Sequence, residues 1–179
     1  MEAERTATIA LTDAQGFVEI TGSPLANGAG TTASKLAIFW CRATSGAMGN
    51  PTVGATADHQ AGVILTWRGC RASGNPWDVI ATQVTDTTTT TPSAPAVTTT
   101  VGNTCIVSAI SRGVSTAIGQ FSAWGNGATE RFDAGTSNGN GGGVGVADYT
   151  YAGPGTTTAT SATLNNTSMY CAFTIALRG

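Results

Sequence analysis

Apolar and polar residues alternate with a period of two along most of the chain, which is the spacing of a β-strand with one buried face. The clearest case is residues 168–177, where Cys171, Phe173, Ile175 and Leu177 fall on one face and small or polar residues fall on the other. No window of about ten residues carries the 3.6-residue apolar stripe of an amphipathic helix. The pattern predicts a chain made of strands.

Two segments, residues 35–42 and 61–68, are apolar on both faces. Strands of this kind lie in the middle of a sheet that is covered on both sides, so we expect two central strands here. The low-complexity stretch at residues 82–100 contains prolines, which exclude a helix and favour an edge strand or an extended crossover. A core strand resumes at residues 104–110, so strand patterns flank this stretch on both sides.

Turn-forming Gly, Pro and Asn residues separate the strands at intervals of roughly 10–15 residues, which is typical of an antiparallel sandwich. Because apolar strands continue on both sides of the low-complexity stretch, we expect one domain over residues 1–179. The predicted fold class is therefore all-β, an antiparallel β-sandwich that resembles a jelly roll.

The composition indicates a polar surface that carries few charges. Threonine accounts for 32 of the 179 residues, and it is a β-branched residue that favours extended backbone and suits the solvent face of a sheet. Only 10% of the residues are charged, against about 25% in ordinary soluble domains, while the 41% of hydrophobic residues allow a real core. A β-protein with so few charges tends to associate through its edges, so we expect a component of an assembly.

The charge pattern argues against nucleic acid and membrane as partners. The net charge is −2, and the seven Arg and the single Lys35 are dispersed, so no basic stripe is available for phosphates. No apolar run approaches the roughly 20 residues of a membrane span. The acidic start at residues 1–5 lacks the basic character of a signal peptide, and we expect none.

Few residues offer a basis for catalysis. Asp58 and His59 are the one neighbouring pair of a catalytic type, and we expect this loop histidine to act as a hydrogen-bonding or capping residue. Glu130 and Asp133 stand three apart on an expected strand, so we expect them to point to opposite faces, unlike the paired carboxylates of a glycosidase. The glycine run at residues 139–145 lacks the spacing of a phosphate-binding loop and is expected to serve positive φ or close backbone approach. We expect no catalytic residues, no cofactor and no metal.

Four cysteines, Cys41, Cys70, Cys105 and Cys171, lie far apart without a CxxC pair, which argues against a metal site. Each lies in or beside an apolar strand, so buried free thiols are the first expectation. Disulfides, within the chain or between subunits, are the alternative. Four cysteines allow three pairings within one chain, and their spacing does not choose among them.

Beyond its composition, the chain carries ordered motifs at residues 58–70, 73–79, 98–109, 121–124, 139–147 and 172–177. Together they resemble a family of β-rich proteins encoded in the structural-gene regions of tailed bacteriophages and prophages, over residues 15–179. Most members are known only as virion-associated, so the resemblance implies a structural role and carries over no catalytic residues. Related proteins usually begin with a longer segment, which implies that this sandwich lacks its first strands or completes an edge with a neighbouring subunit.

The residue pattern and the resemblance predict a non-enzymatic structural protein of a tailed-phage virion, either a head decoration protein or a protein attached to the neck or tail. The expected partners are the major capsid protein or neck and tail proteins, together with further copies of this chain in a homo-oligomer, for which we expect a trimer. We expect the protein in the virion after assembly in the host cytoplasm. Because virions leave the cell, late oxidation into intersubunit disulfides is consistent with this location.

The alternative is a tail-tip or fibre module that recognises a glycan on the host cell surface. In that case Trp77 and Asn75, in the turn-rich loop at residues 71–78, are the candidate contacts, with the indole stacking on a sugar. The interpretation that we favour for Trp77 is an anchor that packs beneath this loop.

Overall fold

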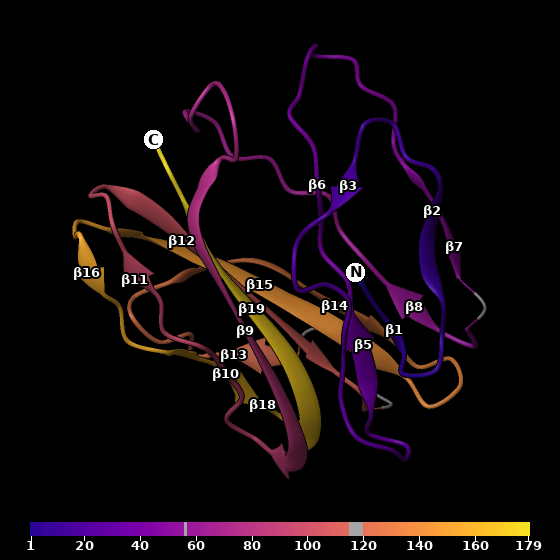
Figure 1. The fold of residues 1–179 in the computed structure, drawn as a ribbon. Helices are drawn as coiled ribbons and strands as arrows, with labels where there is room; N and C mark the ends of the chain where they lie inside the picture. The colour runs from indigo at the N-terminus through magenta and orange to yellow at the C-terminus, as the bar shows by residue number, and fades with distance from the viewer. Residues whose placement is uncertain (56, 115–119) are drawn as a thin grey trace.

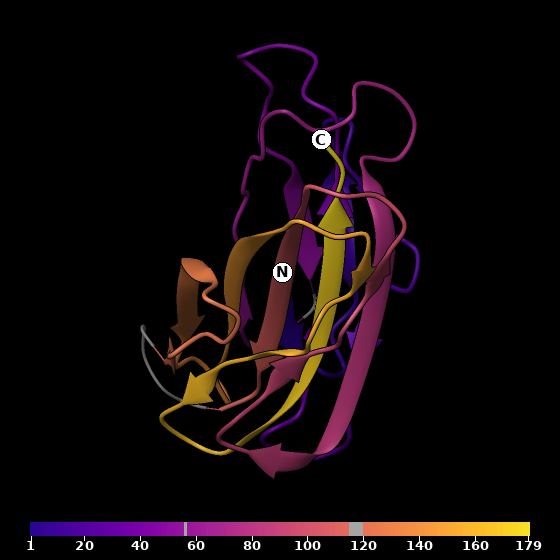
Figure 2. The same ribbon diagram turned by 90° about the vertical axis from the view of Figure 1, so that its left-hand side faces the viewer.

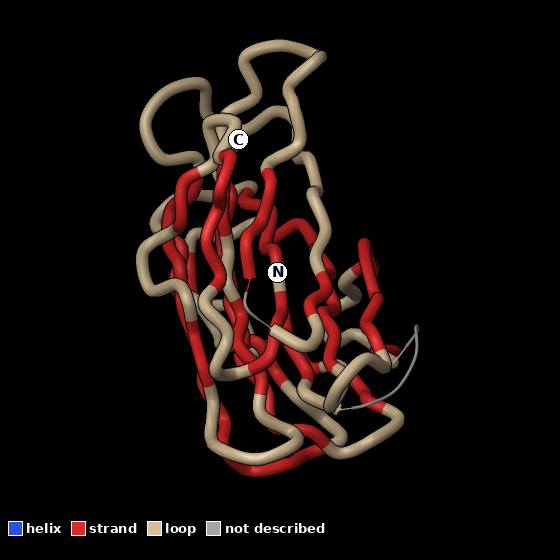
Figure 3. The backbone as a smooth tube through the Cα atoms, turned by 90° about the vertical axis from the view of Figure 1, so that its right-hand side faces the viewer, coloured by secondary structure: helices blue, strands red, loops and turns tan. Residues whose placement is uncertain are grey.

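The computed structural model describes residues 1–55, 57–114 and 120–179, and within them the regular elements are all β-strands (Figure 3). Every strand pairing in these ranges is antiparallel. The prediction of an all-β antiparallel sandwich is therefore confirmed. No helix in the described ranges is long and apolar enough to cross a membrane.

The centre of the molecule is a five-stranded sheet with the strand order β14-β15-β12-β19-β9, called the main sheet below. Its strands are β14 (Thr129–Thr136), β15 (Gly142–Tyr151), β12 (Thr104–Arg112), β19 (Ser168–Leu177) and β9 (Trp77–Thr89). Figure 2 shows β9, β19 and β12 running side by side. β19 and β12 are the core strands predicted from the alternation. β9 forms an edge strand over the first part of the low-complexity stretch at residues 82–100, for which an edge strand or an extended crossover was predicted.

The inner strands of the main sheet are buried on both faces, and their sequences show why. Val107 and Phe173 belong to the apolar cluster on one face, while Ile110 and Ala172 belong to a second cluster on the other face. Large and small residues alternate along these strands, so other layers can approach closely on either side.

Residues 1–61 supply a second layer, which lies to the right of the main sheet in Figure 1. It contains a four-stranded sheet in the order β4-β5-β1-β8 and two strand pairs, β2 with β7 and β3 with β6. The bounds are β1 (Glu2–Glu4), β2 (Ile9–Asp13), β3 (Val18–Glu19), β4 (Leu25–Ala26), β5 (Ser34–Leu36), β6 (Phe39–Trp40), β7 (Thr52–Ala55) and β8 (Gln60–Ala61). Strand β1 lies between β5 and β8, so that Ala3 opposes Lys35 on one side and Gln60 on the other.

The opposite face of the main sheet is covered by three short two-stranded ribbons. They pair β10 (Ser93–Ala94) with β17 (Thr160–Ser161), β11 (Thr98–Thr99) with β16 (Gly155–Thr156), and β13 (Phe121–Ser122) with β18 (Thr163–Leu164). The hydroxyls of Thr98 and Thr156 lie 2.8 Å apart, so two of the threonine runs pair with each other at the surface. The sandwich therefore has three layers, with the main sheet in the middle (Figure 1).

The two central strands expected at residues 35–42 and 61–68 are formed only in part. The first is divided between β5 and β6, and the second contributes only the end of β8, because residues 62–69 contain no strand. Burial still alternates there, since Leu65 packs against the core while Ile64 is 49% exposed. The prediction for 61–68 was wrong because alternation reports burial, whereas a strand also needs a neighbour for its backbone.

Candidate functional site

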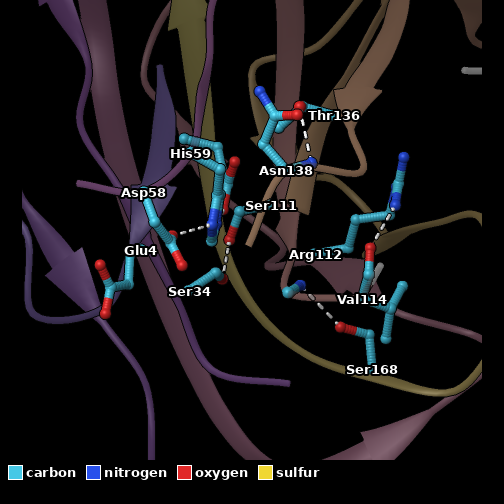
Figure 4. A network of polar contacts seen from close by, with 12 residues as sticks. Glu4, Ser34, Asp58, His59, Ser111, Arg112, Val114, Thr136, Asn138 and Ser168 are labelled. Atoms are coloured by element: carbon cyan, nitrogen blue, oxygen red, sulfur yellow. Dashed lines mark hydrogen bonds and ion pairs between the residues drawn. The ribbon is translucent and has the colours of Figure 1, made fainter. Parts of the chain in front are cut away.

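A cluster of charged side chains is buried where the second layer meets the main sheet. Glu2 on β1 is 0% exposed, and its Oε1 lies 3.3 Å from Nε2 of His59, an ion-pair separation without hydrogen-bond geometry. Nδ1 of His59 lies 2.7 Å from Oδ1 of Asp58, and Figure 4 shows this contact. The register explains the placement, because Glu2 opposes Ala61 and His59 stands just before β8. His59 thus bridges two carboxylates, which agrees with the hydrogen-bonding role expected for it.

The glycine run makes room for this cluster. A Cβ atom on Gly139 would strike the carboxylate of Asp58, and a Cβ atom on Gly142 would strike the carboxylate of Glu2. Gly139 also has a φ of +55°, which disfavours other residues. The expected close approach is therefore confirmed, because the carboxylates of Asp58 and Glu2 approach glycine backbone that carries no Cβ atom.

Arg112, at the end of β12, is fully buried next to the same cluster. Its Nη1 donates a hydrogen bond to the carbonyl oxygen of Val114 at 3.0 Å, and a Cβ atom on Gly143 would lie 2.8 Å from its Nη2. The hydroxyls of Ser34 on β5 and Ser111 on β12 lie 2.8 Å apart (Figure 4). The contact between Ser34 and Ser111 joins the second layer to the main sheet, whereas the contacts given for Arg112 stay within residues 112–143.

The pKa values in the cluster are shifted by burial and by pairing. Burial raises the pKa of Glu2, and His59 partly offsets this effect. The carboxylate of Glu2 raises the pKa of His59, with a smaller contribution from Asp58 and against the opposing effect of burial. The imidazole therefore keeps its proton to a higher pH than a free histidine, and its ion pairs with Glu2 and Asp58 stabilise the second layer where that layer packs on the main sheet.

The two layers also enclose an apolar cavity of about 700 Å³ that is partly open to solvent. Its floor is the main sheet with Val107, Val144 and Ile175, and its walls include residues 37–43 and 60–67.

Three tryptophans line this cavity and are held in fixed positions. The rings of Trp40 and Trp77 meet edge to face, with their centroids 5.1 Å apart and their planes at 84°. Nε1 of Trp67 donates to Oδ2 of Asp148 at 2.7 Å, and Nη2 of Arg131 donates to Oδ1 of the same carboxylate at 2.8 Å. The indole of Trp67 is therefore tied to the main sheet.

The predicted loop contacts have different surroundings. Trp77 packs against the apolar cluster, which is the anchoring position that we favoured, whereas Asn75 is exposed in the loop before β9. Trp77 therefore belongs to the cavity wall, and Asn75 belongs to the outer surface.

All four cysteines are free thiols in this structure. Burial raises the pKa of Cys171 to about 12 and the pKa of Cys105 to about 11, and it also raises the pKa of Cys41. Such thiols stay protonated and weakly nucleophilic at neutral pH. Cys70 is partly buried, and disulfides between subunits stay a prediction.

The two outer strands of the main sheet differ in how their edges are protected. Strand β14 carries Glu130, Arg131 and Asp133 and has a register shift, and both features discourage pairing with another chain. The shift places Glu130 opposite Ala147 and Asp133 opposite Gly145, so these two carboxylates share a face and the prediction of opposite faces was wrong. Strand β9 pairs with β19 alone in the described ranges, and its residues 79–85 carry no charge, no proline and no register shift. Val84 in this stretch is 44% exposed. The β14 edge is therefore protected, whereas the β9 edge over residues 79–85 has no further strand paired with it in the described ranges and is called open below.

Sequence reasoning missed three buried charged residues, Glu2, Arg112 and Asp148. Arg112 ends the strand run Ser108-Ala-Ile-Ser, and Asp148 follows Val144-Gly-Val-Ala. A single charged residue within or at the end of a strand of small and apolar residues was the signal that could have identified Arg112 and Asp148, because buried charges are rare unless they are paired.

Comparison of the chain with protein-family models, with curated proteins and with solved structures gave no match. The fold and the site define the class of protein in structural terms as a three-layer antiparallel β-sandwich with one open sheet edge and an apolar cavity between two layers. In the part of the chain that the structure describes, no three His, Cys, Asp or Glu side chains are grouped to hold a metal ion.

Proposed function

We propose that this chain is a non-enzymatic structural protein of a tailed-phage virion, placed on the head as a decoration protein or attached to the neck or tail. It acts through contacts with other virion proteins and with further copies of itself. The observation that carries the proposal is the open edge of β9.

An open edge presents unpaired backbone N–H and C=O groups that pair readily with a strand of another chain. Residues 79–85 offer such an edge without the charges, proline or bulges that natural sheets use to block it. Because β14 is protected, pairing is directed to one side of the main sheet. This asymmetry supports a defined assembly contact over unlimited aggregation.

The composition of the β9 edge supports the same role. Within residues 79–85, the exposed positions Thr82 and Val84 carry no charge that a partner would have to desolvate, and the nearest exposed charge on β9 is Asp86. A contact of this kind combines backbone pairing with modest apolar burial, as in strand addition between proteins.

The glycan-recognition alternative has less support from the geometry. It depends on Trp77 offering an aromatic face to a sugar, but this ring packs against Trp40 and lines the cavity. We therefore favour contacts between proteins as the function.

Quantitative mass spectrometry of purified phage particles that encode this chain tests the virion role. Many copies per head support decoration, and a few copies per particle support a neck or tail position. Particles that lack the chain would contradict the proposal.

A pair of variants tests the open edge itself. Val84→Lys places a charge on β9, and Val18→Lys is the matched control because Val18 is also exposed, at 53%, on the short strand β3. We expect V84K to weaken self-association or binding to particles by about tenfold, equivalent to about 1.4 kcal/mol, and V18K to leave both unchanged. Equal behaviour of the two variants would argue against β9 as the contact.

A further inference from the structure

The cavity between the second layer and the main sheet has the size and lining of a ligand site. Its volume of about 700 Å³ lies within the roughly 300–1,000 Å³ of small-molecule pockets. Aliphatic and aromatic side chains from both layers line it, among them Ile38, Val63, Leu65 and Val146. Protein interiors are otherwise close-packed, so a space of this size is a distinct feature of the fold.

The walls of the cavity are fixed by contacts that need no ligand. Trp67 is bonded to Asp148 on the main sheet, and Trp40 and Trp77 brace each other. Preorganised aromatic walls raise affinity for an apolar guest, because little side-chain freedom is lost on binding.

Arg42 adds one charge to this apolar surface. Among the described residues that line the cavity, it is the one with a charged side chain. Its Nη1 donates to the carbonyl of Arg71 at 2.6 Å and its Nη2 to the carbonyl of Gly74 at 2.8 Å. Both acceptors are neutral, and no carboxylate pairs with this guanidinium in the described ranges. Both hydrogen bonds are exposed to solvent, so the guanidinium lies at the rim of the cavity, without a carboxylate partner in the described ranges and with five N–H donors.

From this combination we infer that the cavity binds a single-chain amphiphile with a carboxylate head, a molecule of the fatty-acid class. The chain lies against Trp40, Trp67 and Trp77, and the head pairs with Arg42, whose planar fork suits a carboxylate. The inference goes beyond the virion role and does not depend on it.

Titration of the delipidated full chain with cis-parinaric acid, a fluorescent fatty acid that accepts energy from tryptophan, tests the site. We expect saturable quenching of tryptophan emission at one acid per chain, with a Kd in the micromolar range or below. The methyl ester of the same acid is expected to bind about tenfold more weakly, because it has no charge for Arg42.

Variants separate the chain-binding and head-binding parts of the site. Val63→Phe fills part of the cavity and is expected to weaken acid binding at least about tenfold, whereas Thr88→Phe, on the exposed end of β9, is the matched control and leaves it unchanged. Arg42→Gln is expected to remove the preference for acid over ester, and Arg42→Lys to retain part of it. Circular dichroism and urea unfolding verify that each variant is folded.

Three outcomes overturn the inference. One is the absence of saturable quenching in the folded parent chain, and another is an equal loss of binding in V63F and T88F. The third is a parent chain that forms a dimer, binds no acid and becomes monomeric in the V63F variant. That result would assign the cavity to a second copy of this chain. None of these outcomes changes the copy number in particles, so this inference and the virion role fail separately.

Discussion

Replacing His59 by glutamine removes the imidazolium that pairs with Glu2 and keeps a polar side chain in its place. Glu2 is 0% exposed, so its carboxylate cannot turn toward water once the partner charge is gone. We expect the His59→Gln variant to fold with a clearly lower free energy of unfolding.

Two limits set the size of this loss. If Glu2 stays charged without its partner, breaking a buried pair costs about 3–5 kcal/mol. If Glu2 takes up a proton instead, its ordinary pKa of 4.5 sets the cost of neutrality at pH 7 to about 3.4 kcal/mol, at about 1.36 kcal/mol per pH unit. The response with the lower free-energy cost dominates, so we expect the free energy of unfolding to fall by about 3 kcal/mol. The attraction of Arg112 for Glu2 reduces this loss.

The pH dependence identifies the cause of the loss. In the variant, burial raises the pKa of Glu2, so the penalty is absent below its ordinary value of 4.5 and grows as pH rises through the folded pKa. In the parent chain, Glu2 raises the pKa of His59, so the stabilisation is complete below the ordinary value of 6.5 and is lost as pH rises through the folded pKa. The stability gap between the two proteins therefore widens from about pH 4.5 to about pH 6.5 and narrows at higher pH.

Urea unfolding followed by tryptophan fluorescence at about pH 4.5, 6.5 and 9 measures this gap. The double variant Glu2→Gln/His59→Gln is expected to recover most of the loss at neutral pH, because the fully buried carboxylate that caused the penalty is gone. A gap of the same size at every pH would refute the reasoning, and so would a double variant less stable than H59Q.

Two further predictions concern the glycine run and the thiols. Gly142→Ala is expected to lower the free energy of unfolding by about 1–3 kcal/mol, because its Cβ would overlap the buried Glu2 carboxylate, whereas Gly46→Ala has open space and should change it by less than about 0.5 kcal/mol. Equal melting temperatures of these two variants would contradict the overlap. In the reduced native chain, Cys171 is expected to resist a thiol-reactive disulfide reagent until urea unfolds the protein, while the partly exposed Cys41 reacts before it. Mass spectrometry of the labelled peptides checks this order, and early labelling of Cys171 would show that β19 opens in the native state.

The alternation of apolar and polar side chains correctly located the strands that lie between two paired strands of the main sheet. Strand β19 occupies the predicted residues 168–177, and β12 begins at the predicted Thr104 and continues to Arg112. A period of two reports burial directly, so it succeeds wherever the buried environment comes from paired strands. It failed at residues 61–68, where the side chains are alternately buried although the backbone from residue 62 has no partner strand.

The charged cluster could not be predicted, because its members come from distant parts of the chain. Glu2, His59 and Gly142 meet only through the register of β1 with β8 and the packing of that layer on β15. The glycine run was recognised as a place of close approach, but the sequence does not say which group approaches. The cavity could not be predicted from the sequence for the same reason, because two layers together form it and no single segment does.

Strand β19 lies between β12 and β9 in the main sheet, although it follows both of them along the chain. During translation, β9 and β12 therefore have no common neighbour until residues 168–177 have been synthesised. A ribosome that stalls before Ser168 releases a chain in which β12 lacks one of its two partners and in which Ile106 and Ile110 lose the apolar neighbours that β19 supplies. Without β19, strand β9 has no paired strand in the described ranges and β12 keeps β15 alone, so a truncated chain would expose apolar strand faces that favour aggregation.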